Sequence, residues 1–395
     1  MTKLPEARDP TLEAVDAAIV KNNQQEARTY LGASGLGDSC SRKLWYGWRW
    51  ILPQIIEATG WRNILDGNAG EPVMAERLKA VPQLRLITED QDGGQFGVAA
   101  LGGHLRGHLD GVINGLFQAP KTWHVWEHKQ VSEKKFRELK KKIDDLGEKS
   151  ALEAWNAIYF IQAQLYMGLI KNGPIKRHYT TVASAGGRQI QSVRTEFQKE
   201  VFDWAIEKAR EIIESKTPPM RVSEKPDYYL CKWCNFQEHC HGASKTAQVN
   251  CRTCAHSTPL LDENAGAPGK PVGHGAWRCE FHGHTLTLKD QRKGCSKHLF
   301  IPELIPWAHP HLLDEANNQI HYRTDKGNEF INAENNAWVT KPRHFTSKDL
   351  QHINDYHIDN DDLILQTLAK FSPSITKVTK AAKEDLPFFD DDIPF

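Results

Sequence analysis

The chain has 395 residues, of which 39% are hydrophobic and 25% are charged, an ordinary balance for a globular protein with one large core and a smaller additional module. Fifty basic residues balance fifty acidic ones, and no apolar run is long enough to cross a membrane. The first ten residues mix acids, bases and prolines and lack the apolar core of a secretion signal. The composition therefore predicts a cytoplasmic protein without a membrane segment.

The secondary structure expected in the first 220 residues alternates between helices and strands. Helices are expected at residues 11–29 (with Thr11 as N-cap), 71–78, 152–170 and 197–216, and a turn at 32–37. Strands are expected at residues 84–88, 96–100, 105–113, 122–130, 178–183 and 189–196. This order predicts an α/β fold in which helices flank a sheet.

The charges are unevenly distributed along the chain. Residues 381–395 hold five acids and one base, so the remainder carries a net positive charge. A basic run follows the strand expected at 122–130 and consists of Lys134, Lys135, Arg137, Lys140, Lys141 and Lys142. Such a run is either a solvated helix face or a contact for a DNA backbone, and the sequence leaves both interpretations open.

The C-terminal part of the chain differs in composition. Residues 227–299 hold seven of the eight cysteines, together with many Gly, Pro and His residues. A small core of this kind is normally held by metal. Strands near 319–323 and 338–340 and a helix from Ser347 predict a small α+β appendage. The predicted organisation is a catalytic domain at 1–245, a zinc-ribbon-like module at 246–300, the appendage at 301–370, and a flexible linker with an acidic tip at 371–395.

Two strand segments place acidic residues close to a lysine. Asp110 ends Gly107-His108-Leu109-Asp110, and Glu127 is followed two residues later by Lys129, so both side chains leave the strand on one face. Carboxylates are ligands for a hard divalent cation, and a lysine can position an attacking water. Glu71 can add a third carboxylate from the start of a helix. By itself an acid-x-Lys triplet is usually a surface feature.

The order of these residues along the chain is more specific. Glu71, Asp110 and Glu127-x-Lys129 precede Gln162-x-x-x-Tyr166, whose two side chains share a helix face. In this order the chain resembles the PD-(D/E)XK nuclease superfamily, in particular its RecB-like branch, over about residues 30–245. The resemblance implies a restriction-endonuclease-like mixed sheet flanked by helices. It also implies that Asp110, Glu127 and the carbonyl of His128 bind Mg²⁺ or Mn²⁺, that Lys129 positions water, and that Gln162 and Tyr166 support the site or the DNA.

The first acidic position departs from part of this family. Many RecB-like members have a histidine where Glu71 aligns, whereas lambda-type phage exonucleases have a glutamate. His108 is an alternative ligand, and it shares a face with Asp110 only if the strand is regular. The competing interpretation is that His108 is a structural neighbour of the site.

The first set of cysteines consists of Cys231-x2-Cys234-x5-Cys240 and the early Cys40. A lone early cysteine with this later spacing resembles the iron–sulfur nucleases, including CRISPR-associated RecB-like enzymes and the AddB subunit. The resemblance implies that Cys40, Cys231, Cys234 and Cys240 hold a [4Fe–4S] cluster that clips the two ends of the nuclease domain together. A zinc site with the same four ligands remains the alternative.

The second set of cysteines is Cys251-x2-Cys254, Cys279 and Cys295. These residues predict a structural Zn²⁺ site with four thiolate ligands. His282, His284 or His298 can replace one of the cysteines, and some of the four are free buried thiols in the competing interpretation.

The chain ends Asp390-Asp391-Asp392-Ile393-Pro394-Phe395, which resembles the terminal peptide of bacterial single-stranded-DNA-binding protein. In that family the terminal phenylalanine and its carboxylate enter a basic-rimmed pocket on genome-maintenance partners. The resemblance implies that these six residues let the chain bind host proteins that recognise such a tip.

Together these features predict a Mg²⁺-dependent DNA exonuclease, favoured over an endonuclease, that is phage-encoded and acts in recombination, replication or repair. The alternative is a DNA-binding factor that recruits host repair proteins through its tail, with cleavage secondary. The sequence does not determine the oligomeric state.

Overall fold

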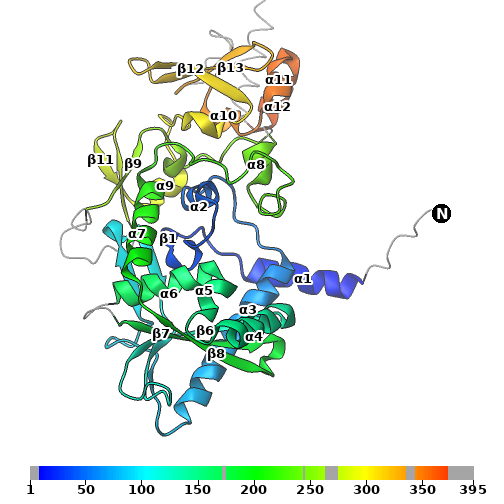
Figure 1. Ribbon diagram of the computed structural model, residues 1–395. Helices are drawn as coiled ribbons and strands as arrows, with labels where there is room; N and C mark the ends of the chain where they lie inside the picture. Colours follow the sequence, from blue (N-terminus) through cyan, green and yellow to red (C-terminus); the bar gives the residue numbers. More distant parts are fainter. Residues whose placement is uncertain (1–8, 171–174, 243–244, 263–274, 335–342, 372–395) are drawn as a thin grey trace, which may run out of the picture. The chain divides into compact units, whose positions relative to one another are not determined.

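The computed structural model describes residues 9–170, 175–242, 245–262, 275–334 and 343–371 (Figure 1). The chain divides into two compact units. The first comprises residues 1–39, 54–213 and 260–276, and the second comprises residues 40–53, 214–259 and 277–395. No helix within the described residues combines the length and the apolar character that a membrane crossing requires.

A five-stranded mixed sheet forms the centre of the first unit. Its strands lie in the order β2 (Arg85–Ile87), β5 (Gly111–Asn114), β6 (His124–Val131), β7 (Arg177–Ser184) and β8 (Ile190–Glu196). β6 and β7 are parallel, and the other neighbours are antiparallel. Because β6 is central and apolar over Val125 and Trp126, it is buried on both faces.

A smaller three-stranded sheet contains β1 (Leu31–Gly32), β4 (Leu105–His108) and β3 (Gly97–Ala100). β4 and β5 were expected as one strand over residues 105–113. The structure breaks this strand at Leu109 and Asp110, so that β4 pairs with β3 in the small sheet and β5 pairs with β6 in the large one. The break places Asp110 at the junction of the two sheets.

Helices flank the large sheet, as Figure 1 shows. α3 (Ala58–Lys79) packs against β6 and β2, α4 (Glu133–Leu146) packs against β7, and α6 (Ala157–Leu169) packs against β6 and β7. α5 (Ala151–Trp155) packs against β8, and α1 (Pro10–Asn22) packs against α3. The predicted α/β fold with a mixed sheet flanked by helices is therefore confirmed.

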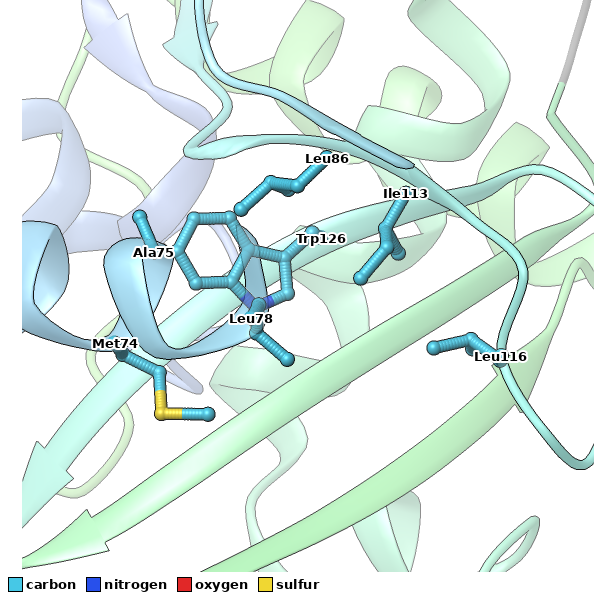
Figure 2. Close-up of a cluster of buried hydrophobic side chains, with 7 residues drawn as sticks. All are labelled: Met74, Ala75, Leu78, Leu86, Ile113, Leu116 and Trp126. Atoms are coloured by element: carbon cyan, nitrogen blue, oxygen red, sulfur yellow. The ribbon is translucent and has the colours of Figure 1, made fainter. Parts of the chain in front are cut away.

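Trp126 of β6 lies in an apolar cluster between α3 and the sheet (Figure 2). The cluster contains Met74, Ala75, Leu78, Leu86, Ile113, Leu116 and Trp126. The α3 members are spaced one, three and four residues apart, which places them on one helix face. The indole N–H of Trp126 donates to Thr181 Oγ1 at 3.0 Å, so its polar atom is satisfied inside the core.

Three helices differ from expectation. α1 ends at Asn22 rather than 29, and its N-cap is Asp9, whose carboxylate accepts from the backbone N–H of Thr11. α3 begins at Ala58, well before the expected residue 71, and contains Pro72. The helix expected at 152–170 is divided at Asn156, which has an extended backbone and whose side chain caps α6 by accepting from Ile158 and Tyr159.

The helix expected at 197–216 is α7 (Lys199–Glu214) of the first unit, and its last residue belongs to the second. The second unit begins with α2 (Ser41–Trp48), and α8 (Gln237–His241) follows α7 along the chain. Arg49, 1% exposed, packs over the rings of Trp45 and Trp277 and donates to the carbonyls of Ser215 and Arg252. Burial lowers the pKa of Arg49 to about 9. The aromatic rings and carbonyls partly replace the hydration that this guanidinium loses.

The rest of the second unit contains two small sheets. β9 (Ser257–Leu260), β10 (Ala276–Cys279) and β11 (His284–Leu286) form one, followed by α9 (Leu288–Lys293). β12 (Ala308–Asp314), β13 (Gln319–Thr324), β14 (Glu329–Asn332) and β15 (His344–Phe345) form the other. α10 (Ser347–Leu350), α11 (Asp355–Ile358) and α12 (Asp361–Phe371) complete the described chain. The strand expected near 338–340 lies outside the described residues.

Candidate active site

Asp110, immediately before β5, lies across from Glu127 of β6. β5 pairs with β6 so that Gly111 is opposite Trp126, which sets Asp110 opposite Glu127. Both residues are buried: Asp110 is 8% exposed and Glu127 is 4% exposed. Asp110 Oδ2 accepts from the backbone N–H of His128 at 2.7 Å, and this bond fixes the first acid to the strand that carries the second.

The two oxygens of Glu127 have different surroundings. Oε1 accepts from Lys129 Nζ at 2.6 Å and from Gln162 Nε2 at 3.0 Å. Oε2 is buried and has no hydrogen-bond partner among the described residues. A buried carboxylate oxygen without a donor is costly, so this atom is a natural ligand for a cation.

Gln162 and Tyr166 reach the site from α6. The Gln162 amide also donates to the hydroxyl of Tyr166 at 3.0 Å, and both side chains are buried. Burial and the charge of Glu127 raise the pKa of Tyr166, which keeps the phenol neutral. Tyr166 comes close to β4 because residue 107 is glycine: a Cβ there would lie 2.5 Å from Tyr166 Cε1.

Glu71 joins the group from α3. The sequence had predicted Glu71 at the start of a helix, but the residue lies in the middle of α3. Burial and the charge of Glu127 raise its pKa, and Lys129 opposes this shift. α3 approaches β6 closely at Gly70, where a Cβ would collide with the Gln130 side chain, and this close packing brings the next residue to the site.

The charges of the site act on one another. Burial, followed by the charges of Glu127 and Glu71, raises the pKa of Asp110 to about 8. Burial opposes the charge on Lys129, but Glu127 and Asp110 raise its pKa above the ordinary value. The Lys129 side chain therefore stays protonated. The raised pKa values of Asp110 and Glu71 indicate that this single cation does not stabilise all three acids in their ionised form.

The side chains of His128 and His108 have other environments. His128 Nδ1 lies 3.0 Å from Thr181 Oγ1, and burial lowers the pKa of this ring to about 4. His108 ends β4 and is exposed, with its ring centre 6.4 Å from that of Tyr30 in an edge-to-face arrangement. Partial burial and the nearby Arg106 and Arg28 lower its pKa.

Two aromatic residues near Lys129 were missed by sequence reasoning. Lys129 Nζ lies 5.2 Å from the centre of the Tyr159 ring, and this ring lies 5.6 Å from that of Trp155. Both are partly exposed. Their four-residue spacing was visible in the sequence, but the Asn156 break between α5 and α6 decides where the rings point.

The cysteines of the first set all belong to the second unit. Burial and then the charges of Cys240 and Cys40 raise the pKa of Cys231, and Cys40 and Cys240 act on Cys234 in the same direction. Cys40 and Cys240 therefore lie close enough to Cys231 and Cys234 to act on them electrostatically. A backbone hydrogen bond from Phe236 favours the Cys234 thiolate.

The second set lines a small pocket in the same unit. Its lining includes all four predicted cysteines, Cys251, Cys254, Cys279 and Cys295, together with His256, His282 and His298. Burial is the main cause that raises the pKa of both Cys251 and Cys254 to about 12. The backbone N–H of His282 donates to Cys279 Sγ at 3.4 Å.

Among the predicted alternative ligands, His282 Nε2 lies 3.7 Å from Cys295 Sγ, whereas His298 Nε2 is close to the Asn250 carbonyl and Thr253 Oγ1. His284 is exposed. Within the described part of the chain, no group of three or more His, Cys, Asp or Glu side chains is arranged to hold a metal ion. Neither a [4Fe–4S] nor a zinc site is therefore visible.

Comparison with known proteins adds a family assignment. Residues 49–241 match the model of the PD-(D/E)XK nuclease superfamily. The chain is similar to the crystal structure of SSO0001, with a TM-score of 0.34 and 13% identity over 57% of this chain and 94% of that chain. It is also similar to an alkaline exonuclease (LHK-Exo) from Laribacter hongkongensis, with a TM-score of 0.32 and 13% identity over 51% and 90%. No curated protein matches.

Residues 49–241 therefore resemble the PD-(D/E)XK nuclease superfamily, and the predicted resemblance to this superfamily is confirmed for that segment.

Proposed function

We propose that the protein is a metal-dependent deoxyribonuclease and that it acts as an exonuclease rather than an endonuclease. The observation that carries this proposal is the environment of Glu127, whose buried Oε2 lacks a donor among the described residues and lies in a group with two further acids. All three buried acids can be ionised together near neutral pH only if a further cation joins them. The nuclease family match supports hydrolysis of phosphodiester bonds.

Glu71, Asp110, Glu127 and the carbonyl of His128 would hold Mg²⁺ or Mn²⁺. When bound, the cation polarises a phosphoryl oxygen and makes water a better nucleophile near neutral pH. The oxygen-only donor set fits a hard cation of this kind. Without the cation, Glu127 Oε1 bonds to Lys129 and Gln162 and the acids repel one another, which explains why the side chains are not gathered as ligands.

The protein's own residues position the reactants. Lys129 has a raised pKa and therefore donates protons in hydrogen bonds, so we assign it to orienting the attacking water and stabilising negative charge on the phosphate, not to deprotonation. Gln162 holds Glu127 from one side, and Tyr166 holds Gln162 in turn. These two are positioning residues, because they act on the carboxylate rather than on the reacting atoms.

The test compares end-labelled linear DNA with covalently closed circular DNA in Mg²⁺ or Mn²⁺. Lys129→Met is expected to reduce cleavage about 100-fold or more while leaving the fold intact. Lys121→Met, which removes an exposed lysine of the same unit, serves as the control. Cutting of circles as fast as linear DNA would contradict the exonuclease assignment. No degradation by the wild type would favour the alternative of a DNA-binding, partner-recruiting factor.

We also propose that the cysteine sets are metal centres, with [4Fe–4S] at Cys40, Cys231, Cys234 and Cys240 and Zn²⁺ at Cys251, Cys254, Cys279 and Cys295. The mutual influence of the thiols supports the first. The shared pocket and the N–H donors to Cys254 and Cys279 support the second, because such donors stabilise thiolates.

Metal analysis of anaerobically purified protein separates the two centres. Cys234→Ser is expected to lose iron and visible absorbance but keep zinc, whereas Cys254→Ser is expected to lose zinc but keep iron. If the wild type contains zinc but no iron, the first cysteine set is a second zinc site rather than a cluster. Absence of both metals would leave the cysteines as free thiols.

The tip, Asp390 to Phe395, lies outside the described residues. We propose that it binds host proteins that recognise the end of single-stranded-DNA-binding protein, and that the nuclease is phage-encoded and acts in recombination, replication or repair. The support is the sequence of these six residues. Removal of Phe395 is expected to abolish binding to such a partner in a pull-down, and equal binding would contradict the proposal.

A further inference from the structure

Helix α4, which directly follows catalytic strand β6, exposes a basic face. Phe136 and Leu139 are buried and mark the inner side of the helix. Lys134, Arg137 and Lys141 are exposed and spaced at i, i+3 and i+7, so they lie together on the side that faces away from the core. We call these three residues the basic stripe.

The stripe residues form no ion pairs with the acids of their own helix. Within the described residues this holds for all three side chains, although Glu133, Glu138, Asp144 and Asp145 lie on the same helix. Arg137 Nε donates to the backbone carbonyl of Glu133 at 3.4 Å. From Lys134 to Lys141 the helix rises about 10 Å. One strand of DNA carries about three phosphates over this length, so the stripe matches a DNA backbone in charge and in spacing.

Contacts between aromatic residues connect helix α4 to the site. Lys129 Nζ lies 5.2 Å from the ring centre of Tyr159, and Tyr159 lies 5.6 Å from Trp155. The indole N–H of Trp155 then donates to the carbonyl of Lys135 in the first turn of α4, at 3.0 Å. Partly exposed rings beside cations are the usual support for unpaired bases in proteins that bind single strands.

We propose that the basic stripe and the Trp155–Tyr159 pair form a track that guides one DNA strand to Lys129. Phosphates lie on Lys134, Arg137 and Lys141, and a base stacks on Trp155 before the strand reaches the acids. This inference rests on the proposed function, because it takes DNA as the ligand. It identifies the surface that binds the DNA strand, and it gives the aromatic residues between α4 and the acids a role in binding a base.

The test of the stripe uses binding rather than cleavage, in a Lys129→Met background. The stripe variant combines three substitutions, Lys134→Gln, Arg137→Gln and Lys141→Gln. The control variant combines Lys135→Gln, Lys140→Gln and Lys142→Gln, which remove the same total charge from other sides of the same helix. Affinity for a fluorescent single-stranded oligonucleotide is measured as salt is varied. The slope of log affinity against log salt should fall by about 2 for the stripe variant and by less than about 1 for the control.

The test of the aromatic pair compares Trp155→Leu with Trp155→Phe. Both lose the hydrogen bond to the Lys135 carbonyl, but only the leucine variant loses the ring. Trp155→Leu should therefore weaken binding about tenfold or more relative to Trp155→Phe, the range expected for one stacked base. Thermal unfolding of each variant checks that the fold is kept.

The outcomes separate this proposal from the proposed function. Equal salt slopes for the stripe and control variants, or equal affinities for the two Trp155 variants, would overturn the track even if the wild type cleaves DNA. Unequal slopes and affinities in a protein that cleaves no DNA would keep the track and reject the nuclease activity.

Discussion

Single residues carry the proposal that this site binds a cation. The Lys129 ammonium and the Gln162 amide share Oε1 of Glu127, while Oε2 remains without a donor among the described residues. Asp110 lies across the strand pair, and its raised pKa is the consequence of burial beside two further acids. A sequence-based motif identifies the acids, but it does not reveal that one oxygen is left for a ligand.

A prediction at this scale concerns the pH dependence of metal binding. The pKa of Asp110 is about 8 in the metal-free chain, so below pH 8 this group is protonated and the proton competes with the metal. Affinity for Mn²⁺ should therefore fall as pH decreases from 8 to 6, by up to about tenfold per unit. Isothermal titration calorimetry in buffers of different ionisation enthalpy measures both the affinity and the released proton.

Asp110→Asn is the control for this prediction. The variant cannot bind a proton at this position, so its weaker metal binding should lose most of the pH dependence. An unchanged pH dependence would assign the competing proton to another group, such as Glu71, whose pKa is also raised.

At the level of elements, two interruptions shape the site. The break between β4 and β5 sends one strand to each sheet and leaves Asp110 at their junction. Asn156 ends α5 and caps α6, which directs Gln162 and Tyr166 toward Glu127. Both interruptions replace what the hydrophobic pattern predicted as one continuous element, because a pattern of apolar residues does not record which partner a strand pairs with.

A prediction for these elements uses two glycines. Gly107→Ala places a Cβ 2.5 Å from Tyr166 Cε1 and should displace the tyrosine, lowering stability by about 1–3 kcal/mol and weakening cleavage. Gly67→Ala is the matched control, because it lies within α3 with open space around it and should raise stability by about 0.5–1 kcal/mol. Urea unfolding midpoints of the two variants should shift in opposite directions, and a neutral Gly107→Ala would contradict the packing argument.

At the level of the whole molecule, burial of ionisable groups links stability to pH. His124 on β6 and His178 on β7 are fully or almost fully buried inside the central sheet. Burial lowers their pKa values to about 4 and about 3. The Nε2 atom of each ring has no hydrogen-bond partner among the described residues, so neither ring is prepared to carry a charge.

Because of these two histidines, we expect the free energy of unfolding to decrease at acidic pH. Above about pH 6.5 both are neutral in the folded and unfolded states and contribute no pH dependence. Below that pH the unfolded chain binds protons that the folded chain refuses, so stability should fall between pH 6.5 and 4, by up to about 3 kcal/mol for each histidine. The midpoint of urea unfolding, followed by tryptophan fluorescence at pH 7, 6 and 5, measures the loss.

His178→Gln should reduce the slope of stability against pH, because it removes one of the two groups. His309→Gln, which changes an exposed histidine, is the control and should leave the slope unchanged. Identical slopes for both variants would assign the acid lability to other groups.

The superfamily that residues 49–241 resemble and the mixed α/β fold class could both be predicted from the sequence. The order of Glu71, Asp110, Glu127, Lys129, Gln162 and Tyr166 and the alternation of strands and helices were enough for this, because both are local patterns. Element ends were less well predicted: α1 is shorter, α3 is longer, and two expected elements are divided. These ends depend on caps and partners that lie far apart in the sequence.

The way these residues act together depends on packing between segments that lie far apart in the chain. Pairing of β5 with β6 sets Asp110 opposite Glu127, and the close packing that Gly107 and Gly70 allow brings Tyr166 and Glu71 to them. The connection from Lys129 through Tyr159 and Trp155 to α4 likewise arises from packing between elements. The physical reason is that burial, orphaned oxygens and shifts in pKa are properties of a three-dimensional environment, which no single segment of sequence contains.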